Sequence, residues 1–129
     1  MCQVVAIRCE VTSLSKQFCV MVGREKVAEA LLHIFHTKTR IYAEIHDVLI
    51  VEEHRRRGHG TRLLNGIRDF VTQYAAEQQH DVHIRFTSGP HRKAANHLYQ
   101  KLGYPLLAKA TKDGTNYYGT VVQPREEKK

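Results

Sequence analysis

The chain has 129 residues, of which 42% are hydrophobic, so it is large enough for one domain whose single core needs no disulfide or metal. No apolar run reaches the length of a membrane span, no signal-peptide pattern is present, and the three cysteines form no CxxC pair, which excludes a disulfide framework. The net charge of +7 favours anionic partners. We therefore expect a cytoplasmic protein with one domain over residues 1–124 and a charged tail over residues 125–129.

Short strands are predicted in the first third of the chain. Residues 3–12 are rich in β-branched side chains and predict a strand, SLSK at 13–16 predicts a turn, and residues 17–23 predict a second strand. The connection REK then leads to residues 27–36, whose Ala, Glu and Leu would also suit a helix. The short turn before them favours a β-hairpin, so we predict a third strand there.

Residues 40–51 carry the clearest strand pattern. Ile41, Ala43 and Ile45 alternate with more polar residues, as expected for a strand with one buried face. Residues 48–51 are apolar on both faces, which predicts a central strand that is covered on both sides.

Two helices and three strands are predicted in the rest of the chain. Apolar residues recur at helical spacing through residues 63–74, and residues 81–88 alternate as a strand. A second helix over residues 92–102 stops at Gly103, and two final strands flank the turn KDGT. The strand–helix–strand unit predicts a right-handed parallel crossover, and the four strands before it predict an antiparallel meander.

The stretch HRRRGHGTRL, residues 54–63, lies between a predicted strand and a predicted helix. The first N–H groups of a helix have no intrahelical partner, and the helix dipole favours an anion there. Gly58 and Gly60 let an anion approach the backbone, and the arginines can add charge-assisted hydrogen bonds. The stretch is neither a P-loop nor a dinucleotide fingerprint. It predicts a phosphate site, with a charged, solvated turn as the alternative.

Two ordered motifs resemble the GNAT N-acetyltransferase superfamily. In that family a strand is followed by RxxGxG/A and a long helix, and Arg55, Gly58 and Gly60 fall on those signature positions. HRKAANHLYQKLGY resembles a later motif of the family, whose positions are occupied here by Ala95, Leu98, Tyr99, Gly103 and Tyr104. The resemblance covers about residues 40–105, and two motifs in the right order are far more specific than one.

The resemblance implies an α/β (α+β) fold with a mixed, mostly antiparallel central sheet and a central parallel strand pair. Family members normally carry two helices between the first two strands, whereas only SLSK separates the predicted strands here. We therefore expect a fold that is shortened at the N-terminus and lacks those two helices, unless the first strands are wrongly assigned. The acceptor site would then be open to a bulky acceptor or be closed by a second subunit, and exposed sheet edges favour a homodimer.

The resemblance also implies acetyl-CoA as the ligand. The pantetheine arm would pair with the strand near Leu49 and Ile50, and Arg92, together with its neighbours, would place positive charge near the phosphates. The pyrophosphate would lie on backbone amides, and the remaining predicted binding residues are Arg55, Arg56, Arg57, Gly58, His59, Gly60 and Thr61.

Acid–base chemistry is expected on both sides of the transferred acetyl group. In the family, the residue at Tyr99 often protonates the departing thiolate, and the YAEI stretch resembles the branch in which the corresponding glutamate, here Glu44, is the general base. His46 lies on the same strand face and Asp47 follows it, and a bulge there would re-aim either side chain. The alternative for Glu44 is a carboxylate paired with an arginine, and for Tyr99 a packed aromatic.

The remaining features favour other functions less. The pairs His33/His36 and His80/His83 are three residues apart, which places them on opposite faces of a strand, so we expect no metal. The leading hypothesis is an acetyl-CoA-dependent N-acetyltransferase that acts on a primary amine of a small molecule, peptide or protein. The alternatives are a non-catalytic CoA-binding module and, third, a basic nucleic-acid-binding domain, although the chain has no recognition helix or aromatic stacking signature.

Overall fold

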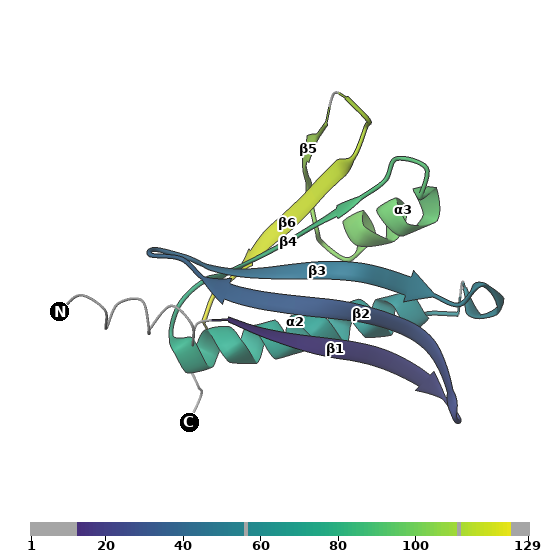
Figure 1. The fold of residues 1–129 in the computed structure, drawn as a ribbon, viewed down its shortest axis with the longest axis horizontal. Helices are drawn as coiled ribbons and strands as arrows, with labels where there is room; N and C mark the ends of the chain where they lie inside the picture. Colours follow the sequence, from purple (N-terminus) through teal and green to yellow (C-terminus); the bar gives the residue numbers. More distant parts are fainter. Residues whose placement is uncertain (1–12, 56, 111, 125–129) are drawn as a thin grey trace.

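A computed structural model describes residues 13–55, 57–110 and 112–124. These residues form one six-stranded sheet with the order β1-β2-β3-β4-β6-β5 (Figure 1). The pair β3–β4 is parallel and every other pair is antiparallel, which confirms the predicted mixed sheet with a central parallel pair. The elements are β1 Ser13–Val22, β2 Glu25–His36, β3 Ile41–Ile50, a short 3-10 helix Glu52–His54, α2 His59–Gln78, β4 Val82–Ser88, α3 Lys93–Lys101, β5 Leu106–Lys109 and β6 Asn116–Val122.

The first hairpin differs from the prediction. SLSK is not a turn but the start of β1, because Ser13 lies opposite Phe35 and the pairing with β2 runs the whole length of the strand. The turn lies at Gly23, whose φ of 61° suits glycine, and β2 already begins at Glu25 within the predicted connection. Cross-strand pairing therefore overrode the turn propensity of serine. The strand predicted over residues 3–12 lies outside the described residues.

The hydrophobic core lies between the sheet and α2. Along β2 and β3 every second side chain is buried, including Leu32, Ala43 and Ile45, as the alternation predicted. The helix buries Leu63, Leu64, Ile67, Val71 and Ala75, which are spaced for one helical face. Figure 1 shows α2 running behind β1, β2 and β3.

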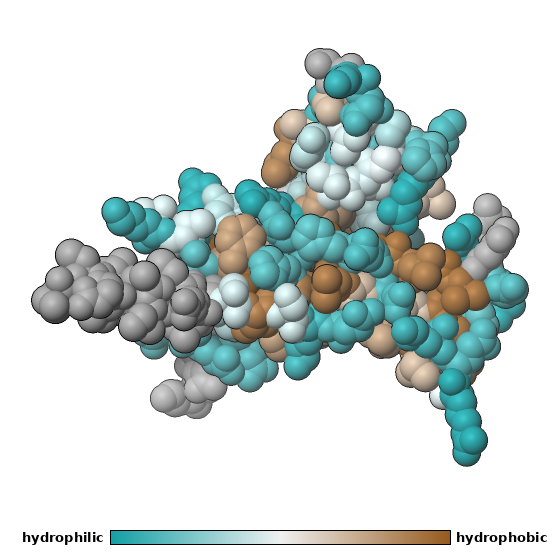
Figure 2. Space-filling view, in the orientation of Figure 1, coloured by the Kyte–Doolittle hydropathy of each residue, from teal (hydrophilic) through white to brown (hydrophobic). Residues whose placement is uncertain are grey.

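Helix α3 packs on the same face of the sheet as α2. Its Tyr99 contacts Phe86 of β4 with ring centroids 4.7 Å apart, and Phe86 points to the same face as the buried core residue Ile84 two positions earlier. Both described α-helices thus cover one face, and no described helix covers the other. Figure 2 views that second face, which is mostly hydrophilic with an apolar area over the carboxyl end of β3, at the right of the view. We call it the open face.

The strands β3 and β4 separate halfway along their length. Their parallel ladder runs only from Ile41 opposite Val82 to Glu44 opposite Arg85, although β3 continues for six more residues to Ile50. Beyond that point β3 contains a bulge, because Asp47 and Val48 together face a single residue of β2, and Asp47 has a φ of 56°. Figure 1 shows β4 and β6 diverging from β3 toward the top of the view.

The divergence explains one wrong prediction. The apolar end of β3 is not covered on both sides, and Leu49 is 51% exposed. With β4 turned away, none of the described strands lies beside this segment on that side. The apolar residues there border an opening instead.

Candidate active site

A cleft of about 840 Å³ lies between the end of β3, the start of α2 and α3. Its volume is within the range of pockets that hold small ligands and cofactors. The described lining residues are Val48, Leu49, Ile50, His54, Arg55, Gly58, His59, Gly60, Thr61, Leu64, His91, Arg92, Lys93, Ala94, Ala95, His97, Leu98, Tyr99 and Lys101. The separation of β3 from β4 and the helix start predicted as an anion site thus border one space.

Unpaired backbone amides lie at the start of α2. The first helical hydrogen bond runs from the Arg62 N–H to the Gly58 carbonyl, at 3.1 Å. The amides of Gly58, His59, Gly60 and Thr61 therefore precede the helical ladder and have no intrahelical acceptor. Since α2 has 20 residues, its dipole adds a partial positive charge at this end. The arrangement suits a phosphate.

The two glycines of the basic stretch are needed for different reasons. Gly58 is the N-cap of α2 with φ 84° and ψ 5°, a left-handed conformation that residues with a Cβ rarely adopt. At Gly60 a Cβ would lie 2.8 Å from the Leu98 side chain and 2.9 Å from that of Ile50. Gly60 therefore allows β3, α2 and α3 to meet closely at the cleft.

Positive charge lines the cleft. Arg55, Arg92, Lys93 and Lys101 line it, and none of the described lining residues is acidic. The Arg55 Nε atom donates to the Ile50 carbonyl at 3.2 Å, which ties the basic stretch to the end of β3. Of the other arginines predicted to bind, Arg57 is exposed and does not line the cleft, and Arg56 lies outside the described residues.

Two histidines stand beside the amides. The rings of His54 and His59 are 5.8 Å apart, and the Nδ1 atom of each is buried without a hydrogen-bond partner. Burial and the positive charges of Arg62, His54 and Arg57 lower the pKa of His59. Both imidazoles could gain a partner from an anion bound in the cleft.

The cleft also has an apolar lining, and Tyr99 borders it. Leu49, Ile50 and Leu98 provide aliphatic surface in the same space as the basic residues and the phenol. Tyr99 is 2% exposed, and burial raises the pKa of its phenol, an effect that the charge of Arg92 opposes only in part. A buried phenol that remains protonated is suited to donate a proton.

A polar network fixes α3 and hence Tyr99. The Tyr118 hydroxyl donates to Asn96 Oδ1 at 3.0 Å, and Asn96 Nδ2 donates to the Gly89 carbonyl at 3.0 Å. The rings of Phe86 and Tyr118 pack against Tyr99 with centroids 4.7 and 5.4 Å away. These contacts join α3 to both β4 and β6.

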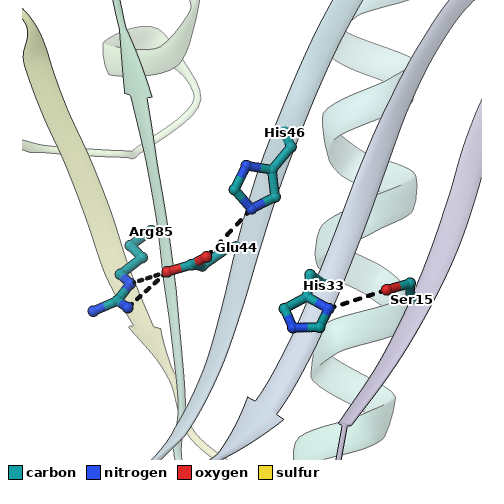
Figure 3. Close-up of polar contacts among 5 residues, drawn as sticks. All are labelled: Ser15, His33, Glu44, His46 and Arg85. Atoms are coloured by element: carbon teal, nitrogen blue, oxygen red, sulfur yellow. Dashed lines mark hydrogen bonds and ion pairs between the residues drawn. The ribbon is translucent and has the colours of Figure 1, made fainter.

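Glu44 and His46 do not line the cleft but lie on the open face of β3, just before the bulge. Glu44 Oε2 accepts hydrogen bonds from Arg85 Nε at 2.7 Å and pairs with Arg85 NH2 at 2.6 Å. Glu44 Oε1 is 3.2 Å from His46 Nε2 (Figure 3). The arginine pairing considered for Glu44 therefore exists, and the carboxylate also contacts the histidine.

β3 contains a bulge at the position where one was considered as a means of re-aiming His46 or Asp47. Glu44 and His46 precede the bulge on the open face, whereas Val48 within it and Leu49 and Ile50 after it line the cleft. Asp47 lies within the bulge and is exposed. The bulge thus connects the two regions within a few residues of one strand.

His33 and His36 lie on opposite faces of β2, as strand alternation predicts. His80 precedes β4, so the same alternation does not apply to His80 and His83. His33 bonds to Ser15 on the open face at 3.0 Å, whereas His36 bonds to Tyr74 of α2 at 2.8 Å. In the described part of the chain, no three His, Cys, Asp or Glu residues group as a metal site, and no helix is long and apolar enough to cross a membrane.

The structure gathers most of the predicted binding residues and adds others. Leu49, Ile50, Arg55, Gly58, His59, Gly60, Thr61, Arg92 and Tyr99 line one cleft. Sequence reasoning missed His54 and Arg85. His54 lies inside the quoted basic stretch, so its position was a usable signal. Nothing in the sequence indicated Arg85, because its contact with Glu44 depends on the register of two strands that are 41 residues apart in the chain.

The fold resembles that of several solved structures. The Escherichia coli ribosomal-protein-S18-alanine N-acetyltransferase superposes with a TM-score of 0.65 at 17% identity, covering 97% of this chain and 79% of that one. Arabidopsis thaliana Naa50 in complex with the bisubstrate analogue CoA-Ac-MVNAL gives 0.67 at 13% identity, covering 81% and 71%. A GNAT-family acetyltransferase from Streptococcus pneumoniae gives 0.65 at 14% identity, covering 93% and 74%.

Sequence comparison identifies the family. No curated protein sequence is similar enough to count as a match. The family model described as Acetyltransferase (GNAT) family matches residues 10–104, which include both motifs. The fold and the motif positions agree with that match, and the chain therefore belongs to the GNAT acetyltransferase family.

Proposed function

We propose that the protein transfers an acetyl group from acetyl-CoA to a primary amine by direct attack. The observation that carries the proposal is the set of groups that line one cleft. Helix-start amides without intrahelical acceptors, four cationic side chains, aliphatic surface and the buried phenol of Tyr99 all border it. These groups together suit a ligand with phosphates, an uncharged arm and a reactive sulfur.

Acetyl-CoA would supply an activated acyl group: the amine nitrogen bonds to the thioester carbon, the carbon–sulfur bond breaks, the nitrogen loses one proton and the sulfur gains one. The amides of Gly58, His59, Gly60 and Thr61 would hold the pyrophosphate, with charge from Arg55 and Arg92. Leu49 and Ile50 would border the pantetheine arm. Tyr99 would give its proton to the sulfur, and Glu44 and His46 would serve the amine side.

A direct assay tests the proposal. Release of CoA thiol is measured with acetyl-CoA over a panel of amines that includes amino acids, polyamines, peptides with free N-termini and a lysine-containing protein. Binding of acetyl-CoA is measured separately by calorimetry. We expect micromolar to millimolar binding and turnover with at least one acceptor class. Absence of both binding and turnover would refute the proposal.

A CoA-binding module without catalysis is the second candidate. The observation that favours it is the state of Glu44, whose two carboxylate oxygens are already engaged by Arg85 and His46. That function predicts thermal stabilisation by acetyl-CoA together with no release of thiol above the uncatalysed rate. Turnover that falls in Tyr99→Phe while acetyl-CoA affinity stays the same would exclude it.

Two further expectations concern the oligomeric state and the location of the protein. Among the described strands, β1 and β5 form the two edges of the sheet, and their outer backbone groups could pair with a second subunit. We therefore expect sedimentation analysis to show a homodimer, and we expect cell fractionation to find the protein in the cytoplasm. The acceptor would approach from the open face, which no described helix covers.

A further inference from the structure

The carboxylate of Glu44 is held on both of its oxygens. Arg85 Nε and NH2 bind Oε2 at 2.7 and 2.6 Å, and His46 Nε2 lies 3.2 Å from Oε1. Uptake of a proton by Oε2 would break two charge-assisted hydrogen bonds to the guanidinium. A carboxylate in this position is better placed to orient a neighbour than to collect a proton.

Strand geometry builds this arrangement. Glu44 and Arg85 are the last cross-strand pair before β3 and β4 separate, so their side chains lie next to each other on the open face. The Arg85 guanidinium lies 4.1 Å from the centre of the Tyr42 ring and 5.6 Å from that of Phe35. The two rings and the carboxylate together give the guanidinium several favourable contacts in this position.

The contact with Glu44 also decides which nitrogen of His46 is free. A carboxylate only accepts hydrogen bonds, so Nε2 carries the hydrogen and donates it to Glu44 Oε1. The lone pair of the neutral imidazole then lies on Nδ1. The His46 side chain is 48% exposed on the open face, one residue before the bulge that leads into the cleft. Nδ1 is therefore accessible to an acceptor on that face.

We propose that His46 Nδ1 takes the proton of the acceptor amine, and that Glu44 and Arg85 are positioning residues that hold the imidazole. This inference rests on the proposed acetyl transfer. The amine nitrogen gives one proton to His46, and Tyr99 gives one to the sulfur. Loss of the proton from His46 to water and uptake of one by Tyr99 restore both side chains, so protons balance over one cycle.

Charged groups around His46 come from three strands. Glu44 and Asp47 belong to β3, His33 to β2 and Arg85 to β4. His33 is hydrogen-bonded to Ser15 at 3.0 Å (Figure 3) and stacks on Phe35. It is therefore a matched control for His46: a histidine on the same face of the sheet that does not contact Glu44. None of the side chains to be changed lines the cleft, so acetyl-CoA affinity reports on whether each variant keeps its fold.

The experiment compares His46→Ala, Glu44→Gln, Arg85→Met, Arg85→Lys and His33→Gln by kcat over about pH 5.5 to 9, with the best acceptor of the panel. His46→Ala should lower kcat by about 100-fold, and free imidazole should restore part of it. Glu44→Gln should lower kcat, because the amide has one oxygen and cannot accept hydrogen bonds from both Arg85 and His46. Arg85→Met should also lower kcat, because Oε2 is no longer held in place. Arg85→Lys keeps the charge but loses the two parallel hydrogen bonds, so its kcat should lie between the native value and that of Arg85→Met. His33→Gln should keep the native kcat.

Rescue of His46→Ala by free imidazole is a result that a purely structural role would not produce. The proposal is overturned if His46→Ala keeps kcat within about threefold of the native value, or if free imidazole restores none of the lost kcat. Nitrogen-15 NMR of the His46 ring gives an answer that needs no acceptor. A neutral ring with its hydrogen on Nε2 supports the contact with Glu44, and a hydrogen on Nδ1 refutes it. If the native protein binds acetyl-CoA but turns over no amine, the enzyme proposal fails even when the NMR result supports the contact.

Discussion

The left-handed N-cap of α2 gives a prediction whose sign can be worked out from the backbone. Replacing Gly58 by alanine places a Cβ on a residue with φ 84° and ψ 5°. The left-handed conformation costs a residue with a Cβ about 1–2 kcal/mol. Alanine also lowers the entropy of the unfolded chain, which returns about 0.4–1 kcal/mol. We expect a net loss of about 1 kcal/mol in the free energy of unfolding.

A second glycine in the same helix is the matched control. Gly66 lies inside α2, has no positive φ, and a Cβ there would meet nothing within 4 Å. Alanine is the better helix former, so Gly66→Ala should raise the free energy of unfolding by about 0.5–1 kcal/mol. The same substitution in one helix is thus expected to have opposite signs at two positions, about 2 kcal/mol apart.

Urea unfolding with a constant m-value measures both variants, and calorimetry measures their affinity for acetyl-CoA. Gly58→Ala should also weaken acetyl-CoA binding, because the amides that follow the N-cap would turn away from the cleft. Gly66→Ala should bind as the native protein does. If Gly58→Ala is as stable as the native chain, or if both variants lose the same stability, the left-handed cap is not what requires glycine.

Three other predictions follow from the cleft. Tyr99→Phe should lower kcat about 10- to 100-fold and leave the affinity for acetyl-CoA unchanged. Because burial raises the pKa of Tyr99, the phenol keeps its proton up to about pH 10, and native kcat, measured by thiol release, should show no decrease from its ionisation below that pH. The pKa of His59 is lower in the folded protein, so the unfolded chain binds more protons and the free energy of unfolding should fall as the pH drops through about 6.5. Midpoints of urea unfolding at several pH values should show a smaller decrease in His59→Gln than in the native protein. Gly60→Ala should displace Leu98 and Ile50 at a cost of about 1 kcal/mol and weaken acetyl-CoA binding in calorimetry more than Gly66→Ala, whereas equal affinities would contradict the close packing.

Much of the fold follows from local patterns. The alternation of Ile41, Ala43 and Ile45 predicted a buried strand face, and all three are in the core. The hydrophobic spacing also predicted α2, and Gly103, whose φ is 92°, lies just beyond the end of α3 as predicted. These features depend on neighbours within one or two turns of the chain.

Features that depend on residues distant in the chain could not be predicted from the sequence. SLSK has the composition of a turn but pairs with residues of β2 that lie up to 22 positions away, such as Phe35 opposite Ser13. Residues 48–51 look like a buried central strand, yet Leu49 is exposed because β4 leaves β3 after Glu44. The apolar pattern is the same for a strand covered by protein and for one that borders a ligand cleft.

Glycine spacing and hydrophobic period are local properties of the chain, so they were enough to predict the family, most of the strands and helices, and a basic, glycine-containing stretch between β3 and α2. They did not show where β3 and β4 part, which glycine is needed for conformation and which for packing, or that Arg85 pairs with Glu44. These last features arise from strand register and helix contact, and many sequences with the same local pattern could satisfy them differently.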